Sequence, residues 1–382
     1  MRITPAPAVL GAALLLGLTA CGGSDSDEGT PGSGGAGAIK VEASDTDCKV
    51  ARTEAPAGTV EFAVTNKGSQ VNEFYVYAKD GRVVGEVENI TPGLTRSFKV
   101  ELTEPGTYET ACKPGMKGEG IRADFTVTGS SSATGAAVSD EKLAAAVAAY
   151  EKYVAHEADE LLENTEAFTA AVKAGDVARA KSLYAKARGP WEEIEPVAES
   201  FGDLDPKIDG REDVVEEGMA FTGYHRLEKD LWKDGLQKDS GAVADQLLAD
   251  VDQVVAKAKA VELNPLQLAN GSKALLDEMA TGKVTGEEER YSHTDLYDFA
   301  ANFEGSKQAV AALRPALQER DPELLKAIDA RFADLDAELD RHRTGDGFVA
   351  YTQLSDAQVK QLTVTLDAVS EQVAKVAGVV AA

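Results

Sequence analysis

The hydrophobic pattern of this chain changes its period near residue 130, and this change limits what the chain can fold into. Before it, short segments alternate apolar and polar residues, as in strands with one buried face. These segments are 59–66, 73–87, 96–102, 106–112 and 122–127. After it, apolar residues such as Leu143, Tyr150 and Leu161 recur at helical spacing. The sequence therefore predicts two domains of different kinds.

Turn signals and start signals give each domain its expected architecture. Asp80-Gly81 predicts a hairpin, so residues 39–128 are expected to form a small antiparallel sandwich. Residues 129–139, GSSSATGAAVS, have a linker composition. Residues 140–382 are expected to form one or two bundles of roughly seven helices. Predicted helices include 240–261, 265–280, 292–318, 322–343 and 355–380.

The first residues have the features of an export signal. An apolar run at 9–18 follows Arg2 and is too short to span a bilayer. It ends in Leu-Thr-Ala-Cys21, which resembles a bacterial lipobox, whose cysteine carries a lipid. We therefore expect a lipoprotein signal peptide at 1–20, lipidation of Cys21 and a flexible tether at 21–38, with a plain signal peptide as the alternative. Such a chain would be extracytoplasmic, either periplasmic or anchored to the outer face of the cell membrane.

The charge and the cysteines narrow the classes of partner. The formal net charge is -26, from 39 basic and 65 acidic residues, and such a surface repels nucleic acid. It suits cations as partners, and it equally suits simple solubility. In an oxidising compartment, Cys48 and Cys112 form either a disulfide or a pair of soft metal ligands.

The segment GYHRLEKD, residues 223–230, offers a candidate metal site. His225 and Glu228 are three residues apart, so a helix brings an imidazole nitrogen and a carboxylate oxygen to one ion. This pair suits Fe, Zn, Mn or Cu; the alternative is an exposed polar pair. Gly223 costs about 1 kcal/mol relative to Ala within a helix, which favours a close approach of another helix there.

Acids elsewhere in the helical region could complete that site. Glu192 and Glu195 border the buried side of their helix, and Asp205 and Asp209 lie in the acidic loop that follows. Facing helices of a bundle build core metal sites in this way. The alternative for each acid is a solvated face. Glu289 and His293, spaced i,i+4, are candidates for a second, looser site.

Long segments of the chain resemble a known family. RGPWEEIEPVAESFGDLDPKIDGREDVVEEGMAFTGYHRLEKDLW, AGDVARAKSLYAKAR and YSHTDLYDFAANFEG are similar to imelysin-like proteins, in particular to iron-uptake components of the EfeO type. The resemblance covers essentially the whole mature chain. It implies an N-terminal all-β cupredoxin-like sandwich followed by an all-α imelysin-like region.

The resemblance also implies a function. It points to an iron-binding lipoprotein that captures Fe³⁺ or Fe²⁺, with zinc as a substitute, and passes iron to a membrane permease (EfeU-like) beside a haem peroxidase (EfeB-like). The expected ligands are His225, Glu228, Glu192, Glu195, Asp205 and Asp209. The alternative is a zinc metallopeptidase, since imelysins were named as peptidases, although the HExxH motif is absent.

The sandwich allows a second metal site. It contains no histidine, so a blue-copper centre is not expected. The resemblance implies Cys48, Glu73 and Cys112 as ligands for copper or ferric iron. The alternative is a Cys48–Cys112 disulfide with Glu73 incidental.

Overall fold

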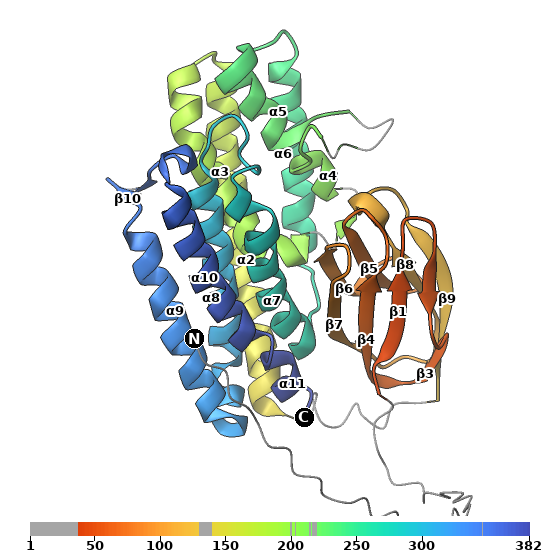
Figure 1. The fold of residues 1–382 in the computed structure, drawn as a ribbon. Helices are drawn as coiled ribbons and strands as arrows, with labels where there is room; N and C mark the ends of the chain where they lie inside the picture. The colour runs from red at the N-terminus through yellow and green to blue at the C-terminus, as the bar shows by residue number, and fades with distance from the viewer. Residues whose placement is uncertain are drawn as a thin grey trace, which may run out of the picture. The chain divides into compact units, whose positions relative to one another are not determined.

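Two β-sheets form the N-terminal region (Figure 1). The computed structural model describes residues 37–129, 140–198, 201–202, 204–213, 215, 220–345 and 347–382. One sheet has the strand order β2-β1-β4-β7 and the other β3-β9-β8-β5-β6. The strands are β1 Ile39–Ala43, β2 Cys48–Val50, β3 Glu54–Pro56, β4 Gly58–Asn66, β5 Asn72–Tyr77, β6 Val83–Ile90, β7 Thr95–Leu102, β8 Gly106–Cys112 and β9 Ile121–Thr128, with a short 3-10 turn, η1, at Pro114–Met116.

The alternating segments become strands, but the pairing differs from the expected antiparallel sandwich. The segment 73–87 divides into β5 and β6 around Gly81, whose φ of +84° suits the hairpin turn. The predicted sandwich is confirmed and most of its strand pairs are antiparallel, but β1 pairs with β4, and β3 with β9, in parallel. The short strands β1, β2 and β3 are additions that the pattern did not indicate.

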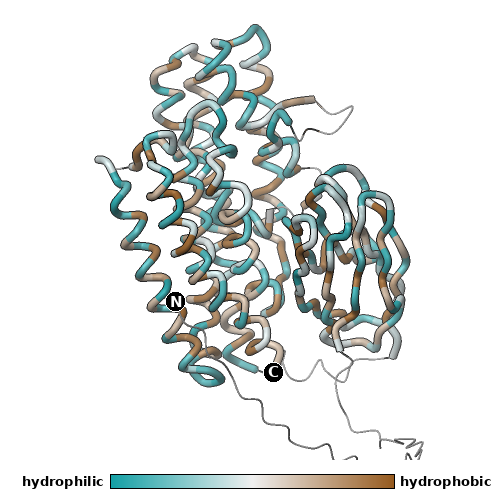
Figure 2. The backbone as a smooth tube through the Cα atoms, viewed as in Figure 1, coloured by the Kyte–Doolittle hydropathy of each residue, from teal (hydrophilic) through white to brown (hydrophobic). Residues whose placement is uncertain are grey.

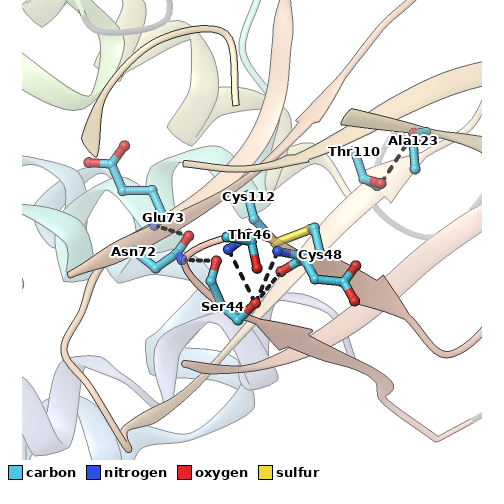
Figure 3. Close-up of a disulfide and its surroundings, with 9 residues drawn as sticks. Ser44, Thr46, Cys48, Asn72, Glu73, Thr110, Cys112 and Ala123 are labelled. Carbon is cyan, nitrogen blue, oxygen red and sulfur yellow. Dashed lines mark hydrogen bonds between the residues drawn. A yellow bond between two sulfur atoms is a disulfide. The ribbon is translucent and has the colours of Figure 1, made fainter. Parts of the chain in front are cut away.

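Aromatic packing and one disulfide hold the two sheets together. The Phe62 ring lies 5.3 Å from the Phe74 ring and 5.5 Å from the Phe125 ring, centre to centre, in the core between the sheets. Cys48 on β2 and Cys112 on β8 form a disulfide, which therefore links one sheet to the other (Figure 3).

The remaining described chain is almost entirely helical (Figure 1). The α-helices are α2 Glu141–Lys173, α3 Val177–Ala198, α4 Leu204–Ile208, α5 Gly223–Lys229, α6 Ser240–Ala258, α7 Pro265–Thr281, α8 Asp295–Arg320, α9 Pro322–Asp340, α10 Asp356–Val373 and α11 Val376–Val380. Shorter elements are the π-helix η4 Asp230–Asp234, the 3-10 turns η5 Lys283–Thr285 and η6 Tyr351–Gln353, and the strands β10 Arg343–Thr344 and β11 Gly347–Phe348.

Packing of apolar faces arranges these helices. The long helix α2 packs against α3, α6 and α8, while α7 packs against α8 and α10. Hydrophobic and hydrophilic residues are intermixed along the helix tubes (Figure 2), as in helices with one apolar face. The predicted starts at Pro265 and Pro322 are confirmed, and a capping box of Asn264 and Gln267 begins α7.

Several predictions fall on residues outside the described ranges. They concern the signal peptide at 1–20, lipidation of Cys21, nearly all of the tether and residues 130–139 of the linker. In the part of the chain that the structure describes, no helix is both long and apolar enough to span a bilayer.

The start of α5 lies directly against the end of α4. Gly223 has φ +77°, and a Cβ atom there would be 2.1 Å from the Ile208 carbonyl oxygen and 2.5 Å from that of Lys207. Both the backbone conformation and the missing space require glycine. The close approach predicted at Gly223 is confirmed, and it fixes the position of α5.

We predict that replacing both Cys48 and Cys112 by alanine destabilises the sandwich by about 4 kcal/mol, from the loop entropy of a 64-residue separation. Urea unfolding followed by β-sheet circular dichroism measures this loss. Trp191 and Trp232 both lie in helical elements, so tryptophan fluorescence should show an unchanged helical transition. A sandwich midpoint that neither this variant nor a reductant shifts would contradict the prediction.

We predict that Gly223→Ala destabilises the helical region more than Gly235→Ala does. Both glycines have φ +77°, but no atom lies within 4 Å of a Cβ at Gly235. At Gly235, which has ψ 159°, alanine should cost only the strain of a backbone conformation nearly restricted to glycine, about 1–3 kcal/mol, whereas Gly223→Ala adds an overpacking cost of about 1–3 kcal/mol. Urea unfolding followed by tryptophan fluorescence compares the two, and equal losses would refute the close approach.

Candidate metal centre

Helix α5 carries His225 and Glu228 on its buried face. Only 2% of His225 and none of Glu228 is exposed, and His225 Nδ1 lies 3.4 Å from Glu228 Oε2. The other oxygen, Glu228 Oε1, accepts the backbone N–H groups of Tyr291 at 2.8 Å and Ser292 at 2.7 Å. The exposed-pair alternative for His225 and Glu228 is therefore wrong, and Glu228 also fixes the segment that precedes α8.

Carboxylates face the imidazole from its other edge as well. His225 Nε2 lies 3.6 Å from Asp209 Oδ1 and 3.5 Å from Glu288 Oε1. Asp209 follows α4 directly, and Glu288 lies between η5 and α8. Two groups of side chains each place their ligand atoms within 4.8 Å of one another. One group is Asp209, His225 and Glu288, and the other is His225, Glu228 and Glu289. We call these five residues the His225 cluster.

A fully buried guanidinium lies within the cluster. Arg188 on α3 contacts Asp209 through Nη1, and its Nε lies 2.7 Å from Glu289 Oε1. Its Nη1 is also 3.3 Å from His225 Nε2. The same side chain pairs with Glu192, and its Nε lies 3.4 Å from Asp298 Oδ1. A single side chain thus neutralises acids that lie on α3, after α4, before α8 and on α8.

The charges around His225 shift its pKa and those of its neighbours. Burial and Arg188 act to lower the pKa of His225, but hydrogen bonds to Glu228 and Glu288 outweigh them and hold it well above the usual value. Burial acts to raise the pKa of Glu288, but the charges of Lys283 and Arg211 hold it well below the usual range. Burial raises the pKa of Glu289 to about 8, although Arg188 opposes the shift.

The structure does not bring Glu192 and Glu195 into the His225 cluster. Glu192 Oε2 lies 3.0 Å from the Lys283 ammonium, and Glu195 Oε2 lies 3.4 Å from it. Asn302 Nδ2 donates to both of these oxygens, at 3.1 and 2.9 Å. In this structure both acids pair with Lys283 and Asn302, and their role as ligands stays a prediction.

The other predicted ligands in the helical region have separate outcomes. Asp209 joins the His225 cluster, while the half-buried Asp205 lines a neighbouring cavity and belongs to neither group of ligand atoms. Glu289 belongs to the cluster, but the structure does not group it with His293 as a pair of ligands. Its carboxylate accepts a hydrogen bond from the Ser292 hydroxyl at 2.8 Å.

Sequence reasoning missed Glu288 and Arg188 altogether. Glu288 lies in the acidic run Glu287–Glu289. The only signal in the sequence was this run of charges, and such runs are usually exposed to solvent. Arg188 ends the quoted segment AGDVARAKSLYAKAR at a buried position of α3, so its helical phase beside Tyr184 was a usable signal.

The second predicted site, in the sandwich, is not formed. The sulfur atoms of Cys48 and Cys112 are bonded to each other, so neither is a thiolate ligand. The Glu73 carboxylate points away from the disulfide (Figure 3) and accepts the Tyr75 hydroxyl at 3.1 Å. The structure therefore has the disulfide that was the alternative, and the expected ligand set of Cys48, Glu73 and Cys112 is wrong.

The arrangement around His225 suits a transition-metal ion. It combines one imidazole with carboxylates from α5, from the residue after α4 and from the segment before α8. Imidazole binds Fe, Zn and Cu, while carboxylates suit harder ions, so the mixture fits iron, manganese or zinc.

Comparison with known proteins agrees with both halves of the fold. The model of a cupredoxin-like domain matches residues 11–127, and the imelysin model matches residues 146–376. The protein named iron uptake system component EfeO from Escherichia coli O157:H7 is 41% identical over 346 residues, which are 89% of this chain and 91% of that protein. Its counterpart in Escherichia coli strain K12 is 40% identical over the same shares.

Among solved structures, the chain is similar to reduced auracyanin from Roseiflexus castenholzii. The alignment covers all of auracyanin and 25% of this chain, at 16% identity and a TM-score of 0.22, so no argument is based on it. The family matches and the identity to the E. coli proteins decide the relationship. The chain belongs to the imelysin family and, within it, to the iron uptake system components of the EfeO type.

Proposed function

We propose that this chain captures iron outside the cytoplasm at the His225 cluster and delivers it to a membrane permease. The observation that carries the proposal is the convergence of His225 and Glu228 with three more carboxylates inside a helical bundle. Its relatives in E. coli are named as components of an iron uptake system, which makes iron the expected cargo.

The donor set is suited to cargo iron in either oxidation state. Carboxylate oxygens favour Fe³⁺ as a hard ion, and the His225 imidazole also accommodates Fe²⁺ or, as a substitute, Zn²⁺. Asp209, His225 and Glu288 offer one set of ligands, and Glu228 and Glu289 offer another on the opposite edge of the imidazole. The sandwich, with its disulfide and without histidine, contributes no copper site to this proposal.

The location and the partners are part of the same proposal. Lipidation of Cys21 would tether the chain to the outer face of the cell membrane, beside the permease that receives the iron. An EfeU-like permease and an EfeB-like haem peroxidase are the proposed partners, and nucleic acid is not one, given the net charge of -26.

We predict that His225→Ala and Glu228→Gln each weaken Fe²⁺ binding by more than roughly 100-fold, since losing even an outer-shell partner of a metal typically costs 10–100-fold. Anaerobic calorimetric titration measures the affinity. His156→Ala is the matched control, because His156 is an exposed histidine on α2 and its loss should leave binding unchanged. Undiminished binding in His225→Ala would place the iron elsewhere.

We predict that the chain does not cleave casein, with or without added Zn²⁺. HExxH peptidases bind zinc with two histidines, whereas each group of possible ligands around His225 has a single imidazole. They also use a free glutamate as general base, whereas Glu289 pairs with Arg188. Gel analysis of casein after prolonged incubation checks this. Zinc-dependent cleavage that disappears in His225→Ala would replace the uptake function with the peptidase alternative.

A further inference from the structure

The guanidinium of Arg188 lies against the same residues that an ion at His225 would use. Its Nη1 atom contacts Asp209 Oδ1 and lies 3.3 Å from His225 Nε2. Its Nη2 atom lies 3.8 Å from Glu288 Oε1. Asp209, His225 and Glu288 form one of the two groups of possible ligands, so Arg188 reaches every member of that group.

A metal ion and the guanidinium cannot hold these positions at the same time. Asp209 Oδ1 and His225 Nε2 are 3.6 Å apart. An ion bonded to both atoms, at the usual distances of about 2.0–2.2 Å, would lie between them and about 3 Å or less from Nη1 of Arg188. Two positive charges at that separation repel each other strongly in a buried site. An entering ion must therefore displace Arg188 from Asp209.

Arg188 has other acids toward which it can move. Its Nη2 atom contacts Glu192, and its Nε atom lies 2.7 Å from Glu289 Oε1 and 3.4 Å from Asp298 Oδ1. Asp298 on α8 is fully buried, and its Oδ2 atom accepts no hydrogen bond from any residue that the structure describes. Buried carboxylate oxygens normally have a donor. Asp298 Oδ2 therefore offers the guanidinium a new partner when it leaves Asp209.

We propose that Arg188 is a displaceable internal cation, which lies on the ligand atoms of the empty site and moves from Asp209 toward Asp298 when a metal ion takes its place. This inference rests on the proposed function and adds a competing group to it. The ion must overcome the attraction between Arg188 and Asp209 before it binds. When the ion leaves, the guanidinium returns and compensates the charge of the ligands again.

The opposite role is a fixed scaffold, in which Arg188 stays in place and holds the carboxylates around the ion. The two roles differ in the sign of one measurable effect. Removal of a competing cation strengthens metal binding, whereas removal of a scaffold weakens it. The displaced position at Asp298 belongs only to the first role.

The test compares Fe²⁺ affinities by anaerobic calorimetric titration. Arg188→Gln removes the competing charge, so it should bind Fe²⁺ at least about tenfold more tightly than wild type. Arg226→Gln is the matched control, because Arg226 on α5 pairs with Asp230 and Asp239 outside the His225 cluster. The control should change the affinity by less than about threefold, as expected for a partly exposed ion pair. Equal or weaker binding in Arg188→Gln overturns the inference.

Asp298→Asn tests the displaced position and decides the matter should Arg188→Gln not fold. The amide keeps the size of the aspartate but lacks the charge that attracts the displaced guanidinium, so Fe²⁺ binding should weaken by about tenfold. Asp295→Asn is its matched control, because this second buried acid of α8 accepts the Glu289 backbone N–H instead of pairing with Arg188. Equal affinities in the two aspartate variants overturn the inference.

The double variant shows whether Asp298 acts through Arg188. In Arg188→Gln with Asp298→Asn there is no guanidinium to displace, so the loss caused by Asp298→Asn should disappear. A purely structural role of Asp298 would give the same loss in both backgrounds. An equal loss in both backgrounds therefore overturns the displaced position at Asp298.

The outcomes separate this inference from the proposed function. If wild type binds Fe²⁺ and Arg188→Gln binds it no more tightly, the inference is overturned and the iron site at His225 stands. If wild type binds none, the proposed function fails. Fe²⁺ binding that is gained in Arg188→Gln and lost again on adding His225→Ala would then still support Arg188 as the cation that occupies the ligand atoms.

Discussion

The buried guanidinium of Arg188 is the interaction on which the helical region depends. It has no contact with water, and it pairs with acids that follow α4, precede α8 and lie on α8 itself. Burying such acids without a partner would cost several kcal/mol for each one. Arg188 therefore compensates the charge of several carboxylates in the helical core, and it ties the segments that carry them around His225.

The hydrophobic pattern predicted most of the regular elements because each depends on local periodicity. Six of the strands and the long helices follow directly from the alternation and from helical spacing. The pattern could not show strands of three residues such as β2 and β3, which are shorter than a period can establish. Parallel pairing of β1 with β4 was also beyond it, since pairing direction depends on contacts between distant segments.

The site was predictable only where its geometry is local. His225 and Glu228 belong to one helical turn, so their spacing places them together. Glu288 approaches His225 through tertiary packing, and its neighbours in sequence give no sign of it. Glu192 and Glu195 had a suitable helical phase, but the phase cannot show that Lys283 neutralises them from a distant turn.

The internal pairing of the cluster would allow the proposed site, although rich in ligands, to release a bound ion. Two backbone N–H groups already bind Glu228 Oε1, and Arg188 already binds Asp209 and Glu289. An entering ion gains only the difference between its own bonds and the interactions that it replaces. The same internal donors re-form their contacts when the ion leaves, so departure does not expose unpaired buried charge. For the delivery of iron proposed above, this balance would serve better than a site built for the tightest possible binding.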